Sequence, residues 1–416
     1  MNQKENDQEE RGQKRSLWRN RDFHLLWSGQ TVSVLGSNVS RLAMPLLVLA
    51  LTHSPAQAGF MAAVRQAPYL LFSLPAGALI DRWDRKLTMI CCDSARWLAL
   101  GSVPVAFALG HVTLLHLYIV SFIEGTGYVF FSLAQIAALP QVVEPAHLAR
   151  AYAFDNITEY VGDLFGPSLG AFIIGLVSQV RMGAILAYVF DSISYLVSVV
   201  SLLFIRVSFQ MERAAEKRRA LYKEIAEGLR FLWRQPLLRI MVVLTTIVNF
   251  LQSPITLIII VLARGPLHIT VQLLGLVLSA EGVGGVFGGF VAPWLRTRLR
   301  FGQISIGSVI LWAGAALILA LAPSAPLLIV GIGITGLLWP IYGVTLVTYR
   351  LSITPEHLQG RVNSAFRFLS YGSEPLGAAV GGLLLAPLGG QLVLFLIAGG
   401  LALSGFGVIF TSLRKA

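Results

Sequence analysis

Long apolar runs alternate with short polar connections along this chain, from about residue 24 almost to its last residue. Each run holds about twenty mostly apolar residues, the length that an α-helix needs to cross a hydrocarbon core of ~30 Å. In lipid only helices and closed barrels satisfy their backbone hydrogen bonds, and these runs are too long and too apolar for barrel strands. The pattern predicts twelve helical spans: 24–50, 56–80, 87–109, 112–137, 153–178, 182–205, 237–262, 271–293, 302–322, 325–348, 363–387 and 390–412.

The longest polar connection, 207–236, lies in the middle of the chain and separates six spans from six. It mixes basic with acidic residues. Within it, the apolar positions of 220–234 recur at helical spacing, which predicts an amphipathic helix on the membrane surface. The pattern therefore divides the chain into a first half over 24–206, a central loop over 207–236 and a second half over 237–412, between tails over 1–23 and 413–416.

The two halves also share a sequence pattern. The segment after the fourth span contains Pro-Ala-His-Leu from Pro145, and the segment after the tenth contains Pro-Glu-His-Leu from Pro355, 210 residues later. An offset of half the chain indicates a six-plus-six repeat, an arrangement typical of membrane transporters. The alternative is a chance similarity between two short loops.

Composition and charge fit this interpretation. The chain is 55% hydrophobic and only 13% charged, against about 25% charged in soluble domains. Most lysines and arginines fall in the tails and the even-numbered connections, and only Arg181 and Arg264 fall in the odd-numbered ones. This asymmetry places both termini in the cytoplasm. The net charge of +11 then reflects topology and contact with anionic headgroups, and we expect no nucleic-acid partner.

Residues for metal or covalent chemistry are sparse. The two cysteines, Cys91 and Cys92, are adjacent, so they indicate neither a disulfide framework nor a metal site. No His-Asp, Cys-His or metal-spaced cluster appears, and the odd-numbered connections are too short to build an active site. We expect no metal, no cofactor and no enzymatic activity.

A charged hairpin connects the second and third spans. It runs from Gly77 to Lys86 and places five charges in the six residues from Asp81. It resembles the cytoplasmic loop between helices 2 and 3 of the major facilitator superfamily, G-x-L-x-D-R-x-G-R-K/R. Asp84 stands where that family usually has glycine, a variant familiar among drug exporters of the macrolide-efflux type.

That resemblance implies a conformational gate formed by Gly77, Asp81, Arg82, Arg85 and Lys86. Asp81 would dock against the cytoplasmic start of the eleventh span in the outward-open state, because helix N-termini attract negative charge. The alternative is that a short cytoplasmic loop simply collects basic residues.

The fifth span carries Gly162, Gly166, Pro167 and Gly170, which resembles the G-x-x-x-G-P-x-x-G-G motif of antiporters in the same superfamily. Glycines four residues apart share one helix face and let a neighbouring helix approach closely. Proline removes a backbone donor and can kink the helix. The resemblance implies export, whereas helix packing alone would explain the glycines without any bearing on direction.

Ionisable residues at membrane depth are costly and are functional candidates by default. A carboxyl group in a low-dielectric cavity binds a proton more readily than one in water, and a site for either a proton or a cation would couple their movements. Glu124 is our first choice, unless Arg41, Arg65 or Arg96 pairs with it permanently. The proton and substrate candidates are Glu124, Asp163, Glu159, Glu281, Glu374, Arg41 and Arg65.

One departure limits the comparison with drug:proton antiporters of the superfamily. Many of them have arginine in an R-x-x-Q-G pattern on span 4, where this chain has Ser121, so their coupling mechanism does not carry over directly. The chain is more similar to the branch of macrolide-efflux and enterobactin-exporter proteins, over about residues 20–412.

The resemblance implies an all-α integral membrane protein, with twelve transmembrane helices in two pseudo-symmetric six-helix halves. It implies a monomeric secondary transporter in the plasma (inner) membrane. We expect export of hydrophobic or amphipathic small molecules, drug- or macrolide-like, by alternating access and proton-coupled antiport. The expected partners are the small-molecule substrate, protons and the lipid bilayer. The alternatives are a dedicated exporter of a siderophore or lysophospholipid, and a transporter-like sensor without transport.

Overall fold

The computed structural model describes residues 17, 20–80, 82–209 and 221–415. Over these residues the regular structure is entirely helical. The α-helices are α2 (Arg21–Thr52), α3 (Pro55–Ile80), α4 (Arg85–Ala108), α5 (Leu114–Val142), α6 (Leu148–Gly175), α7 (Val180–Phe204), α8 (Leu221–Arg234), α9 (Pro236–Gln252), α10 (Ile255–Arg264), α11 (Val271–Arg298), α12 (Phe301–Leu321), α13 (Ala325–Ile353), α14 (Gln359–Tyr371) and α15 (Glu374–Ile409). Short 3₁₀ turns are η2 (Pro145–His147), η3 (Glu356–Leu358) and η4 (Ser412–Lys415).

The predicted all-α membrane fold with twelve helical spans is confirmed. Eight helical segments in the described ranges are long and apolar enough to cross a bilayer by length and composition alone. One of them, Gln359–Ile409, contains two crossings, because the backbone reverses at Gly389 with φ of 73°. The other three spans, α3, α4 and α6, are more polar, and they carry many of the ionisable residues discussed below.

Two boundaries differ from the sequence prediction for local reasons. The first helix begins at Arg21 and not at 24, because the Asn20 side chain accepts a hydrogen bond from the Phe23 amide at 3.0 Å and caps it. The seventh span is two helices, α9 and α10, which are interrupted at Ser253 and Pro254. Proline has no amide hydrogen to continue the helical bonding, which accounts for the interruption.

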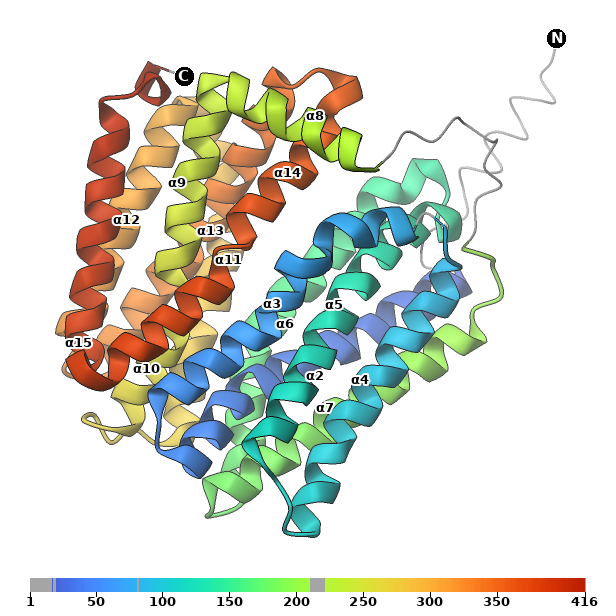
Figure 1. Cartoon of the computed structure of the whole chain (residues 1–416), viewed down its shortest axis with the longest axis vertical. Helices are drawn as coiled ribbons and strands as arrows, with labels where there is room; N and C mark the ends of the chain where they lie inside the picture. The colour runs from blue at the N-terminus through green and yellow to red at the C-terminus, as the bar shows by residue number, and fades with distance from the viewer. Residues whose placement is uncertain (1–16, 18–19, 81, 210–220, 416) are drawn as a thin grey trace.

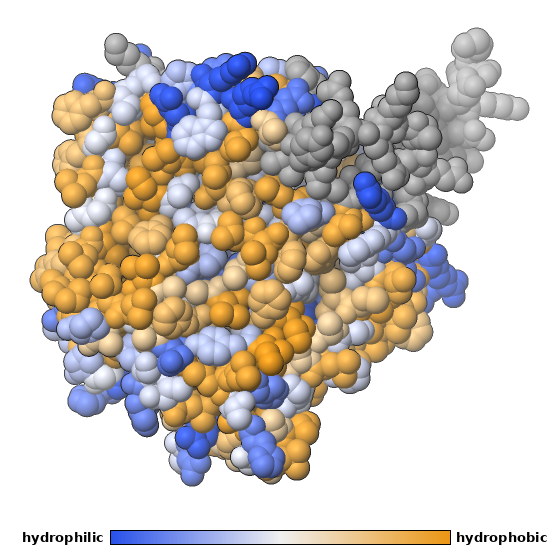
Figure 2. Space-filling view, viewed as in Figure 1, coloured by the Kyte–Doolittle hydropathy of each residue, from blue (hydrophilic) through white to orange (hydrophobic). Residues whose placement is uncertain are grey.

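Figure 1 shows two helical bundles side by side, α2 to α7 in one and α9 to α15 in the other. The start of α2 and the turn η4 lie toward the same end of the molecule, which we call the termini end, and the opposite end is the far end. Helix α8 lies across the termini end of the second bundle. Figure 2 shows a broad apolar zone over the middle of the molecule, with hydrophilic side chains gathered toward its ends, as a bilayer-spanning protein requires.

Two helix pairs hold the bundles together, α3 with α15 and α6 with α11. Small residues form both contacts. A Cβ added at Gly59 would lie 2.6 Å from the Cα of Gly382, and one added at Gly282 would lie 2.3 Å from the Cα of Leu164. Such close backbone approach is typical of helix packing in membranes. Gly59 lies near the start of α3, at the far end of the molecule. Its contact with Gly382 of α15 therefore closes the two bundles against each other at this end.

The predicted amphipathic helix and the predicted repeat both appear in the fold. Helix α8 begins at Leu221, buries Leu232 completely and joins α14 through an ion pair of 2.6 Å between Glu227 and Arg361. The repeated Pro-x-His-Leu segments both fold as a 3₁₀ turn that leads into the next long helix, η2 before α6 and η3 before α14. The two halves therefore repeat local structure as well as sequence.

Candidate functional site

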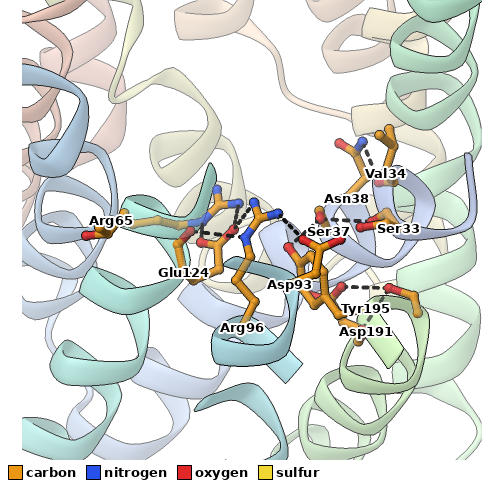
Figure 3. Close-up of polar contacts among 12 residues, drawn as sticks. Ser33, Val34, Ser37, Asn38, Arg65, Asp93, Arg96, Glu124, Asp191 and Tyr195 are labelled. Atoms are coloured by element: carbon orange, nitrogen blue, oxygen red, sulfur yellow. Dashed lines mark hydrogen bonds and ion pairs between the residues drawn. The ribbon is translucent and has the colours of Figure 1, made fainter. Parts of the chain in front are cut away.

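A buried chain of charges crosses the first bundle, as Figure 3 shows. Arg65 of α3 donates two hydrogen bonds to Glu124 of α5, one of them from Nη2 to Oε1 at 2.9 Å. Arg96 of α4 lies between two acids: its Nη2 is 3.9 Å from Glu124 Oε1, and its Nη1 is 3.2 Å from Oδ1 of Asp93. Two acids and two bases thus balance one another.

Helix α7 closes this charge network with hydroxyl groups. Ser198 donates a hydrogen bond of 2.6 Å to Oδ2 of Asp93, and the guanidinium carbon of Arg96 lies 4.5 Å from the ring centroid of Tyr195. The Tyr195 hydroxyl lies 2.7 Å from that of Ser37 on α2. We did not assign these hydroxyl groups a role from the sequence. Their signal was the spacing of polar residues on α7, which places Ser194, Ser198 and Ser201 near one face.

Glu124 occupies a site where it is already charge-compensated. Its side chain is 8% exposed, and that of Arg96 is 5% exposed. A buried carboxylate held by two guanidinium groups retains its charge as long as those groups stay. Of the two interpretations made from the sequence, this geometry favours the permanently paired one, and proton binding at Glu124 stays a prediction.

A second polar region lies between the two bundles. A cavity of about 230 Å³ is formed by α6, α11 and α13. Its lining residues are Tyr160, Asp163, Glu281, Gly282, Gly285, Gly336, Trp339 and Pro340. One carboxylate comes from each half of the chain, an aromatic ring does also, and the glycines leave the space open.

The two cavity carboxylates differ in their partners. Asp163 forms an ion pair of 3.0 Å with Arg41 of α2, in which both side chains remain accessible, at 36% and 44% exposure. The Glu281 carboxylate makes no hydrogen bond or ion pair with any residue that the structure describes. Glu281 is therefore the acid at this cavity that is available to a ligand.

Two other candidate acids, Glu159 and Glu374, do not line the cavity. Glu159 is one turn before Asp163 on α6 and is exposed. Glu374 is the first residue of α15 and does not line the cavity. The predicted site residues therefore fall into three groups. Arg65 and Glu124 belong to the charge network of the first bundle. Asp163 and Glu281 line the cavity, with Arg41 paired to Asp163. Glu159 and Glu374 lie outside both.

The basic residues of the charged hairpin contact the backbone of the first bundle. Arg85 is buried and donates to the carbonyl oxygens of Ala137 and Phe209 at 2.8 and 3.2 Å. Lys86 donates to the carbonyl of Ile205 at 2.7 Å, whereas Arg82 is exposed. These bonds attach the hairpin to the ends of α5 and α7, and a gating role for the hairpin stays a prediction.

The hairpin also contains one small residue, Gly77, and two acidic residues, Asp81 and Asp84. Asp81 lies outside the described residues. A Cβ added at Gly77 would meet no atom within 4 Å. Asp84 accepts a hydrogen bond of 2.8 Å from the Leu87 amide and caps α4, which gives a structural reason for an acid where relatives carry glycine.

The glycine motif of the fifth span lies against α2. Added Cβ atoms at Gly162, Gly166 and Gly170 would lie 2.6, 2.2 and 3.2 Å from atoms of that helix. On another side of α6, a Cβ at Gly275 of α11 would lie 2.8 Å from the carbonyl oxygen of Pro167. The motif thus lies where α6 is held between the first bundle and the second, and its bearing on transport direction stays a prediction.

Sequence comparisons agree with this architecture. A family profile described as "Transmembrane secretion effector" matches residues 15–416. The multidrug efflux pump Tap of Mycolicibacterium fortuitum is 25% identical over 366 residues, which cover 83% of this chain and 85% of the pump. Macrolide efflux protein A of Streptococcus pyogenes is 25% identical over 365 residues, covering 85% of this chain and 87% of that protein.

Solved structures share the fold at much lower identity. A POT family transporter crystallised with 5-aminolevulinic acid superimposes with a TM-score of 0.78 at 10% identity, covering 95% of this chain and 96% of the transporter. A bacterial homologue of the iron transporter ferroportin, in an inward-facing state, gives a TM-score of 0.73 at 14% identity, with coverage of 95% and 99%. Both likenesses show a common fold and nothing about substrate.

Proposed function

Because this chain belongs to the transmembrane secretion effector family of major facilitator transporters, we propose that it exports hydrophobic or amphipathic small molecules in exchange for protons. Transport would proceed by alternating access in the plasma membrane, with both termini in the cytoplasm. The distant similarity to multidrug and macrolide efflux proteins supports this choice of substrate class. The antiporter-like glycine motif of α6 supports the direction.

The cavity between the bundles is the observation that carries the proposal. Alternating access places the binding site at the interface of the two halves, and this cavity takes lining residues from both. Trp339 and Tyr160 offer apolar surface, while Asp163 and Glu281 offer negative charge. That combination suits an amphipathic molecule with a cationic group.

The cavity's volume limits how much of the substrate it can hold. Pockets for drug-sized ligands occupy ~300–1,000 Å³, so about 230 Å³ accommodates one part of such a molecule. We assign this part to the cationic end, next to Glu281. The apolar remainder would extend beyond the cavity along the interface.

Proton coupling would follow from competition at Glu281. A carboxylate that makes no ion pair or hydrogen bond with the described residues can hold either a proton or a cationic substrate, and occupancy by one excludes the other. Asp163 would contribute through its ion pair with Arg41. This pair would break when another anion binds Arg41 or when a conformational change separates the two side chains. Glu124, which contacts Arg65 and Arg96, would hold the first bundle rigid during this exchange.

The test is substrate accumulation in cells that lack their main exporters, with and without this protein. The panel would contain macrolides, dyes and lipophilic cations, and each measurement would be repeated after collapse of the proton gradient. We expect lower accumulation that disappears on collapse. Glu281→Gln should abolish the difference, while Glu144→Gln, which changes an exposed acid in a loop, should preserve it.

Other outcomes would redirect the proposal. Lower accumulation that survives collapse of the gradient would refute proton coupling and leave export standing. If no compound in the panel differs, a dedicated substrate such as a siderophore or lysophospholipid becomes the better explanation. Normal export by Glu281→Gln at matched expression would remove Glu281 from the mechanism.

A further inference from the structure

A second cavity, away from the interface of the two halves, lies at the termini end of the second bundle. It measures about 240 Å³ and is formed where α11 ends, α12 begins and α13 ends. Its lining residues are Arg296, Leu299, Phe301, Ile304, Thr345, Thr348, Tyr349 and Ser352. Phe301 and Tyr349 stack at 4.1 Å between ring centroids with an interplanar angle of 5°. This stack gives the cavity one fixed wall.

The cavity is electropositive. Arg296 is exposed and lines it, and Arg298 and Arg300 follow in the same short connection. None of the lining residues is acidic. The segment from Gly289 to Arg298, which joins the second and third spans of the second half as the charged hairpin does in the first, contains no acidic residue. Its arginines therefore have no acid of their own motif to neutralise them.

The wall opposite Arg296 mixes hydroxyl groups with apolar surface. Thr348 and Ser352 donate hydrogen bonds to carbonyl oxygens of their own helix, at 2.9 and 2.8 Å, and each can turn to a ligand instead. Leu299 is 42% exposed, and Ile304 is buried. The cavity thus offers one full positive charge, two hydroxyl donors and an apolar surface that a small inorganic anion would leave uncovered.

Its position is at the membrane boundary. Trp294, one turn before the end of α11, is 57% exposed, and tryptophan gathers at the headgroup level of membranes. The connection from α11 to α12 lies at the termini end, where Gly302 approaches Leu413 of η4. Lipid phosphates therefore lie beside the cavity at a high local concentration.

We propose that this cavity binds the phosphate of an anionic phospholipid, with Arg296 as its main partner and the apolar wall against the start of an acyl chain. A charge-assisted hydrogen bond between guanidinium and phosphate supplies orientation as well as attraction. The binding is independent of the proposed transport site, since the two cavities share no lining residue.

The experiment is native mass spectrometry of the full chain in detergent, titrated with phosphatidylglycerol, phosphatidylcholine or inorganic phosphate. We expect phosphatidylglycerol to bind, and Arg296→Gln to weaken this binding about tenfold. The matched control is Arg298→Gln. It removes the same charge two residues away, from a side chain that lies over the ring of Trp294 and does not line the cavity.

A second variant tests the cavity without changing charge. Ser352→Phe fills it from an exposed position and should displace phosphatidylglycerol, while the thermal unfolding temperature without lipid stays near that of the wild type. Equal weakening by Arg296→Gln and Arg298→Gln would refute the site, because diffuse charge attraction would then explain the binding. Equal affinity for phosphatidylcholine would refute the requirement for an anionic lipid. Displacement by inorganic phosphate at similar concentration would show that a free anion is the ligand.

Discussion

A single methyl group at Gly59 should prevent the far end of the molecule from closing. A Cβ at this position would lie 2.6 Å from the Cα of Gly382 and 2.7 Å from the carbonyl oxygen of Ala378. Both neighbours are backbone atoms, so a rotamer change cannot relieve the overlap. Gly59→Ala therefore forces α3 and α15 apart, or leaves them in an unfavourable contact.

The size of the effect follows from what the two transport states share. Alanine favours the helix over glycine by roughly 0.5–1 kcal/mol, but this gain is the same in both states and cancels from their equilibrium. The overlap occurs only when the far end is closed, and overpacking costs about 1–3 kcal/mol. Gly59→Ala should therefore shift the population about 5- to 150-fold toward the state that is open at the far end.

The assay measures a distance across the far end. Spin labels would be introduced at two exposed residues of opposite halves, His111 in the loop after α4 and Gln391 two residues after the reversal at Gly389 in α15, once Cys91 and Cys92 are replaced by serine. Double electron–electron resonance should show a larger share of long distances for Gly59→Ala than for the parent.

The control for this prediction is Gly399→Ala on α15, where an added Cβ meets no atom within 4 Å. It should leave the distance distribution unchanged. An unchanged distribution for Gly59→Ala would refute the role of this contact as a closure. A shift of equal size in Gly399→Ala would show that the substitution acts through helix stiffness and not through the overlap.

Three further predictions concern stability. Glu124→Gln should destabilise the fold by about 3–5 kcal/mol, because it leaves a buried arginine uncompensated, and the double variant with Arg65→Gln should recover part of this in thermal unfolding. Asp84→Ala should lower stability by about 1 kcal/mol through loss of the α4 cap, while Asp84→Asn should preserve most of it, as the same melting assay would show. Glu227→Gln should change stability by less than about 1 kcal/mol, since the pair with Arg361 is partly exposed; a larger loss would indicate a latch between α8 and α14.

The sequence predicted the helical spans well because each span depends on a local property, a run of apolar residues long enough to cross a bilayer. Its errors were also local. The Asn20 cap and the break at Pro254 depend on individual hydrogen bonds, which an average over twenty residues does not resolve. The glycine face of α6 was predicted correctly as a surface for close packing, because a four-residue spacing fixes a helix face whatever the partner is.

The grouping of the site residues could not be predicted in the same way. Arg65 and Glu124 are 59 residues apart and on different helices, so their pairing depends on the rotation of both helices within the bundle. Glu281 meets the wall that carries Asp163 only because the second half docks onto α6. The sequence made Glu124 the first choice, but position along a span does not distinguish a paired acid from an available one.

Paired and available acids occupy different parts of the molecule. The contacts of Arg65 and Arg96 with Glu124 and Asp93, and the hydrogen bond from Ser198 to Asp93, connect α3, α4, α5 and α7 directly, which resists relative movement of those helices. At the interface, Glu281 makes no ion pair with any described residue, and the helices meet through close approach at glycines and a hydroxyl contact of 2.7 Å between Ser168 and Ser279. A ligand at Glu281 would therefore change the charge at the interface, while the charge network stiffens the first half. In the proposed transport cycle, alternating access would therefore be a movement between the halves and not within them.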